Sequence, residues 1–206
     1  MISGEGLAEA LAGAECIVDL ATGPTPDEQQ ATEFFTTSAR NLQEAGSDAG
    51  VRRIVVVSII GIDRFTSGYN AAKLAQERVA SAGPIPVRIL RAAQFHEFVD
   101  QLVEWGRQGD VSYVPKMRTQ LVAARTVAAA LADLAGDRES APGPILEIAG
   151  PREESMVEAA RLLAAHRGNG LRIEGVTWDE RYETGAALPG PEAKLAGPTF
   201  EDWLAG

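Results

Sequence analysis

The sequence predicts an α/β fold in which helices cover a parallel sheet. Short apolar segments of strand length alternate with amphipathic segments of helix length along most of the 206 residues, and this alternation is typical of successive strand–helix units. The segment 53–58 is almost continuously apolar, as parallel strands covered on both faces tend to be. The length and the 45% hydrophobic content suit one compact domain.

Each expected element rests on its own periodicity. The predicted strands are short runs of apolar residues, and they lie at 16–21, 53–58, 87–90, 111–114 and 145–148. The predicted helices carry apolar residues at helical spacing, and they lie at 7–11, 25–45, 69–82, 95–107, 122–134 and 153–165. Thr25, followed by Pro26 and Glu28, is the expected cap of the second helix.

We predict two parts within this one domain. Residues 1–108 contain the regular alternation and form the core of the sheet, whereas residues 109–206 form a smaller and less regular C-terminal region. Pro and Gly are denser from Pro142 onward and again between Leu188 and Pro198, which indicates more loop in that region.

Composition excludes several classes of function. A net charge of −10 and a pI of about 4.7 oppose direct binding to nucleic acid or to anionic membranes. The apolar runs are too short for a transmembrane helix, and the first residues do not resemble a secretory signal. Cys16 is the single cysteine, which favours a reducing, cytoplasmic location. His96 and His166 stand outside any metal-binding motif, so we expect no metal site.

Tyr69 and Lys73 are the one recognisable chemical pair. Lys73 follows Tyr69 by four positions at the start of a predicted helix, so both side chains share one face. A phenol ordinarily has a pKa of about 10, and a nearby ammonium group lowers it, which suits a tyrosine for proton transfer. Ser58 ends the preceding strand and could hold a substrate oxygen. The alternative is that Lys73 pairs with Glu77 at the surface while Tyr69 merely packs.

The start of the chain departs from a complete dinucleotide-binding fold. Such a fold begins with a strand, a GxGxxG turn and a helix, and one strand–helix–strand unit needs about 30 residues. Few residues precede the strand at Cys16. Gly4 and Gly6 resemble the start of a glycine-rich turn, but Glu9 occupies the place of its third glycine. We therefore expect the parallel sheet to be incomplete at its N-terminal side.

Several segments together resemble the atypical short-chain dehydrogenases/reductases, in particular their NmrA-like NAD(P)H-binding group. The resemblance is strongest from Leu7 to Phe98, and Tyr69 to Lys73 falls where that superfamily carries its YxxxK motif. The sequence has no counterpart of the family's N-terminal glycine-rich segment. The resembling segments are 38–45, 50–58, 69–73, 91–98, Gly150-Pro151 and 200–204. The family implies a Rossmann-like, doubly wound sheet, with residues 109–206 on the substrate side.

The resemblance also implies roles for individual residues. Tyr69 would exchange a proton with a substrate carbonyl, Lys73 would bind the nicotinamide ribose and assist Tyr69, and Ser58 would position the substrate and contact the cofactor. NAD(P)H is the implied cofactor. The remaining implied cofactor residues are Ala21, Thr22, Gly23, Arg91, Ala92, Ala93, Gln94 and Phe95. The implied substrate residues are Gly61, Phe95 and Phe98.

Three functional hypotheses follow. The first is an NAD(P)H-dependent oxidoreductase that reduces a small carbonyl-type substrate. The second is a non-catalytic NAD(P)H sensor that works with a regulatory protein partner. The third is a shortened member of the family that cannot bind the cofactor, in which an open sheet edge and uncovered apolar faces favour a homo-oligomer.

Overall fold

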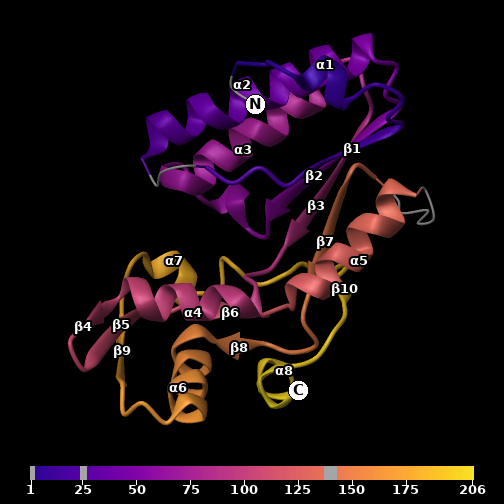
Figure 1. Cartoon of the computed structure of the whole chain (residues 1–206). Coiled ribbons are helices and arrows are strands. Elements are labelled where there is room, and N and C mark those ends of the chain that lie inside the picture. The colour runs from indigo at the N-terminus through magenta and orange to yellow at the C-terminus, as the bar shows by residue number, and fades with distance from the viewer. Residues whose placement is uncertain (1–2, 24–26, 137–142) are drawn as a thin grey trace. The chain divides into compact units, whose positions relative to one another are not determined.

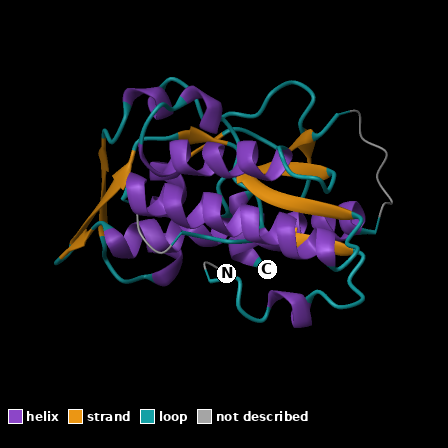
Figure 2. Ribbon diagram, turned by 90° about the horizontal axis from the view of Figure 1, so that it is seen from above, coloured by secondary structure: helices purple, strands orange, loops and turns teal. Residues whose placement is uncertain are grey.

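The protein contains both helices and strands (Figure 2). They alternate along most of the chain, so the protein is an α/β protein. A computed structural model describes residues 3–23, 27–136 and 143–206. Within these ranges, no helix is long and apolar enough to cross a membrane. The predicted cap Thr25 and its neighbour Pro26 lie outside the described residues, and α2 begins after Asp27, whose carboxylate accepts a hydrogen bond from the Gln30 amide.

The helices and strands have the following bounds. The helices are α1 (Leu7–Ala10), α2 (Glu28–Asp48), the 3-10 helix η1 (Ile62–Arg64), α3 (Gly68–Ser81), α4 (His96–Trp105), α5 (Ala124–Ala135), α6 (Met156–Arg167), α7 (Glu180–Glu183) and α8 (Phe200–Ala205). The strands are β1 (Cys16–Asp19), β2 (Arg53–Ile59), β3 (Val87–Ala92), β4 (Arg107–Gln108), β5 (Val111–Pro115), β6 (Arg118–Thr119), β7 (Ile145–Ala149), β8 (Glu154–Ser155), β9 (Arg172–Val176) and β10 (Lys194–Leu195).

The central sheet is parallel and has the order β1-β2-β3-β7-β10, which confirms the predicted Rossmann-like class. β1 pairs with β2 in parallel, with Cys16 opposite Arg53 and Asp19 opposite Val56. Because β1 is first in this order, it is an edge strand among the described strands. The side chains of Val18 and Leu20 are 38% and 62% exposed. The expectation of a buried strand at 16–21 is therefore wrong for these two residues.

The chain forms two compact units that interleave along the sequence. The first contains the described residues up to Arg91 and within 129–146, and the second contains residues 92–128 and 147–206. β3 and β7 contribute to both units. We predicted a single division after residue 108, whereas the compact units divide after Arg91 and again within α5 and β7. The predicted substrate role of residues 109–206 stays a prediction.

In the first unit, α2 and α3 lie side by side and pack against the sheet (Figure 1). Apolar side chains on the inner faces of both helices meet those of β1, β2 and β3, because the helical period places them on one stripe. This core contains Leu11, Ile17, Ala39, Leu42, Val51, Ile54, Val56, Ala80, Ile85 and Ile89. A smaller cluster of Ala31, Phe35 and Ala72 packs against Tyr69.

The second unit has its own core around α4, α6 and α8. Its three-stranded sheet has the order β4-β5-β9, with β4 and β5 antiparallel and β5 and β9 parallel. Arg107, predicted as the last residue of a helix, instead forms β4 together with Gln108. Likewise β8 occupies Glu154 and Ser155, so that α6 begins at Met156 and not at residue 153.

Candidate functional site

The start of α3 is tied to α2 and places Tyr69 one residue into the helix. Gly68 has a φ of 71°, a conformation that favours glycine, and its amide donates to the Glu28 carboxylate at 2.7 Å. This bond satisfies one of the free amide groups that every helix start presents. The entry of α3 is thereby fixed next to the loop that follows β1.

Tyr69 contacts the loop that the resemblance assigned to the nucleotide. Its hydroxyl lies 3.3 Å from the Thr22 hydroxyl and accepts a hydrogen bond of 3.3 Å from the Gly23 amide. The edge of the Tyr69 ring meets Phe35 at a centroid distance of 5.5 Å. A Cβ atom on Gly23 would lie 3.2 Å from both rings. Thr22, Gly23 and Tyr69, three predicted site residues, are therefore brought together.

Lys73 is buried, with only 5% of its surface exposed. Its ammonium group donates to the Val57 carbonyl at 2.8 Å and to the Gln76 side-chain oxygen at 2.6 Å, and it lies 4.7 Å from the centroid of the Phe35 ring. Burial lowers the pKa of Lys73 to about 8, although the carboxylates of Asp19 and Glu77 oppose this shift. The alternative of a surface lysine is therefore wrong.

Lys73 keeps one hydrogen-bond donor for another group. An ammonium group has three N–H donors, and within the described part of the chain two of them have partners. The predicted partner Glu77 instead binds the guanidinium of Arg91 through two hydrogen bonds of 3.0 and 2.8 Å. Arg91 also lies 3.4 Å from Asp63. Its predicted cofactor role stays a prediction, and its side chain is engaged by these two carboxylates.

Ser58 and Gly61 lie at the end of β2 and in the turn beyond it. Ser58 is buried, and its hydroxyl has no hydrogen-bond partner among the described residues. A buried hydroxyl without a partner is unfavourable unless a ligand or water completes it. Gly61 precedes η1 and has a φ of 78°, which accounts for glycine at this turn. No hydrogen bond between Ser58 and Tyr69 occurs in the described structure.

The predicted residues between Ala92 and Phe98 belong to the second unit, whereas Ala21 belongs to the first. Ala92 and Ala93 are buried, and the Gln94 side chain accepts a hydrogen bond of 2.5 Å from the Thr119 hydroxyl. Phe95 precedes α4 and forms a backbone bridge with Val122. Phe98 packs edge-on against Trp105 at 5.7 Å. These contacts are structural, and the cofactor and substrate roles of these residues stay predictions.

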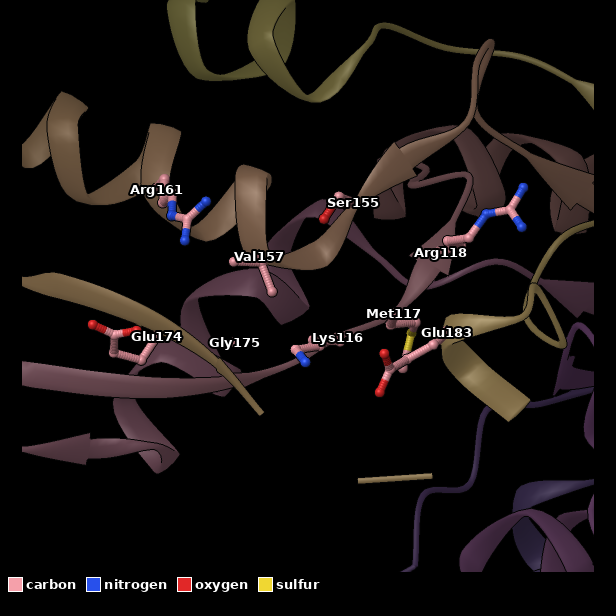
Figure 3. Close-up of a pocket in the computed structure, with 9 residues that line it drawn as sticks. All are labelled: Lys116, Met117, Arg118, Ser155, Val157, Arg161, Glu174, Gly175 and Glu183. Carbon is pink, nitrogen blue, oxygen red and sulfur yellow. The ribbon is translucent and has the colours of Figure 1, made fainter. Parts of the chain in front are cut away.

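A shallow pocket of about 470 Å³ lies within the second unit (Figure 3). Three basic side chains line it, but Arg118 binds Glu153 through two hydrogen bonds and Arg161 binds Glu158. In Figure 3 the side chain of Arg118 points away from Lys116 and Arg161. The full lining is Lys116, Met117, Arg118, Ser155, Val157, Arg161, Glu174, Gly175 and Glu183. Because two of its three cations are already paired, this pocket is a weaker candidate than the surroundings of Tyr69.

Sequence reasoning missed two residues next to Lys73. The side chain of Gln76 donates to an oxygen of Asp19 at 2.8 Å, and both residues are buried. A carboxylate inside an apolar strand was the signal for Asp19, because buried acids need a partner. Gln76 lies three residues after Lys73 and thus on the same helix face. Among the described residues, no group of acidic, His or Cys side chains could hold a metal ion.

Comparison with known proteins identifies the family. Residues 3–138 match the model of a family described as NAD(P)H-binding. This match covers more than half of the chain, and the chain therefore belongs to the NAD(P)H-binding family. The resemblance to atypical short-chain dehydrogenases/reductases is confirmed at this level, whereas membership of the NmrA-like group stays a prediction. No curated protein matches the chain.

Solved structures show the same fold. MoeE5 in complex with UDP-glucose and NAD has a TM-score of 0.73 and 20% identity, over 99% of this chain and 81% of that one. WbmG of Bordetella bronchiseptica in complex with NAD has a TM-score of 0.67 and 18% identity, over 100% and 74%. A nucleoside-diphosphate-sugar epimerase from Staphylococcus aureus has a TM-score of 0.71 and 16% identity, over 100% and 81%. At these identities the likeness supports the fold alone.

Proposed function

We propose that the protein is an NAD(P)-dependent oxidoreductase in which Tyr69 donates a proton to a small carbonyl-type substrate. The observation that carries this proposal is the joint placement of Tyr69 and Lys73. Both side chains contact Phe35 from one face of α3, and the Tyr69 hydroxyl meets the loop that follows β1. Membership of the NAD(P)H-binding family supports the choice of cofactor.

Two features near this pair fit a nicotinamide cofactor. Lys73 has one N–H donor left for a ribose hydroxyl. Ser58 has a buried hydroxyl that needs a partner. When bound, the reduced cofactor supplies the hydride for the substrate carbonyl carbon. Among the described residues, no GxGxxG turn follows a strand.

The residues of the chain then have distinct tasks. Tyr69 supplies the proton that the carbonyl oxygen takes up as hydride reaches the carbon. The positive charge of Lys73 stabilises the negative charge left on the phenol oxygen. Ser58 would donate a hydrogen bond to the same carbonyl oxygen and so increase its polarisation. Because Lys73 acts in its charged form, activity is expected to decline as pH rises above about 8.

Cofactor binding and turnover of the purified protein test the proposal in two stages. Calorimetric titration with NADH and NADPH measures binding, and cofactor oxidation with a panel of aldehydes, ketones and quinones measures turnover. We expect Tyr69→Phe to retain cofactor binding and to lose at least about a hundredfold in kcat, the size of a general acid contribution. Tyr113→Phe, in β5 of the second unit, is the matched control and should retain activity.

The outcomes separate the hypotheses. Full activity of Tyr69→Phe would contradict the proposed role of the phenol. Cofactor binding without turnover on any substrate would favour the sensor hypothesis, and the engagement of Lys73 by Gln76 and Val57 is compatible with it. The absence of binding to either cofactor would favour a family member that cannot bind the cofactor.

A further inference from the structure

Tyr69 and Lys73 share helix α3, and they are also connected through hydrogen bonds to β1 and the loop that follows it. This connection passes through Asp19, the last residue of β1, whose two carboxylate oxygens have different partners. Asp19 is 4% exposed. A carboxylate this deeply buried is costly unless hydrogen bonds and opposite charge compensate for its lost hydration.

One oxygen of Asp19 leads to Lys73. Oδ2 accepts a hydrogen bond of 2.8 Å from the side-chain amide of Gln76, and the amide oxygen of Gln76 accepts one of 2.6 Å from the Lys73 ammonium. Gln76 is fully buried, so water does not compete for either end of its amide. The amide group therefore has one orientation, with its donor toward Asp19 and its acceptor toward Lys73.

The other oxygen of Asp19 leads to Tyr69. Oδ1 accepts a hydrogen bond of 2.9 Å from the Ala21 amide, which shapes the first residues of the loop after β1. The next two residues of this loop, Thr22 and Gly23, contact the Tyr69 hydroxyl. Asp19 thus bonds the loop that holds the phenol as well as the amide that holds the ammonium group.

We infer that Asp19 is a positioning residue that orients Tyr69 and Lys73 together, and that Gln76 is its link to Lys73. The inference rests on the proposed function and deepens it. The negative charge of Asp19 also favours the protonated form of Lys73, because Asp19 and Glu77 oppose the lowering by burial that leaves the pKa of Lys73 at about 8. Neither residue need touch the substrate, since both act through the catalytic pair.

Two substitutions test the charge of Asp19 and the link through Gln76, one at a time. Asp19→Asn keeps the shape but removes the charge and leaves one acceptor oxygen in place of two. Gln76→Met keeps a similar length and removes both hydrogen bonds. Gln43→Met is the matched control, because Gln43 is also a buried amide of this unit and bonds only to the backbone of Ala80 and Ile85 among the described residues.

The ionisation of Lys73 can be measured without substrate or cofactor. The chain contains only three lysines, Lys73, Lys116 and Lys194, so protein labelled with 13C-lysine gives three Cε signals, and the loss of one in Lys73→Arg assigns Lys73. The midpoint of Lys73 should lie near pH 8 in the original protein. We expect Asp19→Asn and Gln76→Met to lower it by about one pKa unit, and Gln43→Met to leave it unchanged.

An unchanged titration midpoint of Lys73 in Asp19→Asn would overturn the inference. This outcome is decisive even if Gln76→Met fails to fold. Kinetics supply the second measurement. With turnover, Asp19→Asn should move the alkaline decline of kcat to lower pH by the same interval and change KM little. A shifted midpoint in a protein without turnover would support the charge effect of Asp19 on Lys73 and count against the proposed function, so the two can fail separately.

Discussion

The guanidinium of Arg91 lies between two carboxylates that differ in burial. Glu77 binds it through two hydrogen bonds and is 5% exposed, whereas Asp63 lies 3.4 Å away and is 56% exposed. Removing one member of a buried pair leaves an uncompensated charge and costs about 3–5 kcal/mol. We expect this loss in the free energy of unfolding for Glu77→Ala, as measured with urea.

Asp63→Ala is the control for this pair. An exposed ion pair contributes about 0–1 kcal/mol, so the substitution should change the free energy of unfolding by no more than that. Equal losses in the two variants would show that Glu77 does not hold Arg91 in the way described.

His96 makes stability depend on pH. Its ring is buried between Phe200 and Trp203, at centroid distances of 5.4 and 5.3 Å, and burial lowers its pKa below 6.5, partly offset by the Leu121 backbone and Glu97. The unfolded chain then binds more protons than the folded protein below pH 6.5, so the free energy of unfolding decreases as pH falls through this range.

Unfolding measured between pH 7 and pH 5 tests this dependence. His96→Gln cannot take up the proton and should show a flatter profile than the original protein. His166, the other histidine, is exposed on α6, and His166→Gln should keep the original slope. A slope that survives in His96→Gln would assign it to other groups.

Only some residues of the candidate site could be predicted from the sequence. The spacing of Tyr69 and Lys73 is enough to predict that both side chains share one helix face, because helical geometry requires it. The partner of Gln76 was not predictable, since Asp19 lies 57 residues away in the sequence. The burial of Lys73 was also missed, because a lysine is rarely buried without several partners and those partners come from other elements.

At the scale of the elements, a side chain of α2 forms hydrogen bonds at the end of α3 and in the loop that follows it. Gln43 of α2 donates to the Ala80 and Ile85 carbonyls and accepts from the Ile85 amide. Gly83 lies against it, and a Cβ there would be 2.2 Å from Cδ of Gln43. We expect Gly83→Ala to displace this amide and to lower the free energy of unfolding by about 1–3 kcal/mol, the cost of buried polar groups left unpaired.

A double substitution tests this mechanism. In a Gln43→Ala background the added methyl group at residue 83 meets no amide, so Gly83→Ala should cost little more. Urea unfolding of the two single variants and the double variant gives the coupling between the sites. Additive losses would contradict a clash with Gln43.

Long elements were predicted better than short ones. The spacing of the apolar residues in α2, α3 and β2 could be read from each segment alone. Each of the three was predicted within about three residues of its observed bounds. β4, β6, β8 and β10 have two residues each, and such strands exist only through pairing with distant segments. β9 was missed because Glu174 and Gly175 interrupt its apolar pattern, although it pairs along the whole of β5.

For the whole molecule, net charge opposes association at the edge of the sheet. β1 is an edge among the described strands, and Val18 within it and Leu20 just after it are exposed. Open strand edges with apolar side chains favour pairing with a second copy. Two copies that each carry a net charge of −10 repel one another. Salt weakens this repulsion, because charges further apart than about 10 Å are largely screened at 0.1 M ionic strength. We expect self-association to increase between 20 and 500 mM salt in sedimentation velocity.

Lysine substitutions identify the surface responsible. Val18→Lys places a charge on the edge strand and should reduce the salt-dependent association. Leu162→Lys changes an exposed apolar residue of α6, away from any strand, and should leave it unchanged. If both variants associate like the original protein, β1 is not the interface.

Three residues of α3 each bind a different strand. Lys73 donates to Val57 of β2, Gln76 donates to Asp19 of β1, and Glu77 accepts from Arg91 of β3. The helix cannot leave the sheet without breaking all three connections, and these strands cannot separate while it stays. Local opening of this part of the first unit is therefore suppressed, and the backbone amides of α3 and β2 should exchange with deuterium only when these elements open cooperatively.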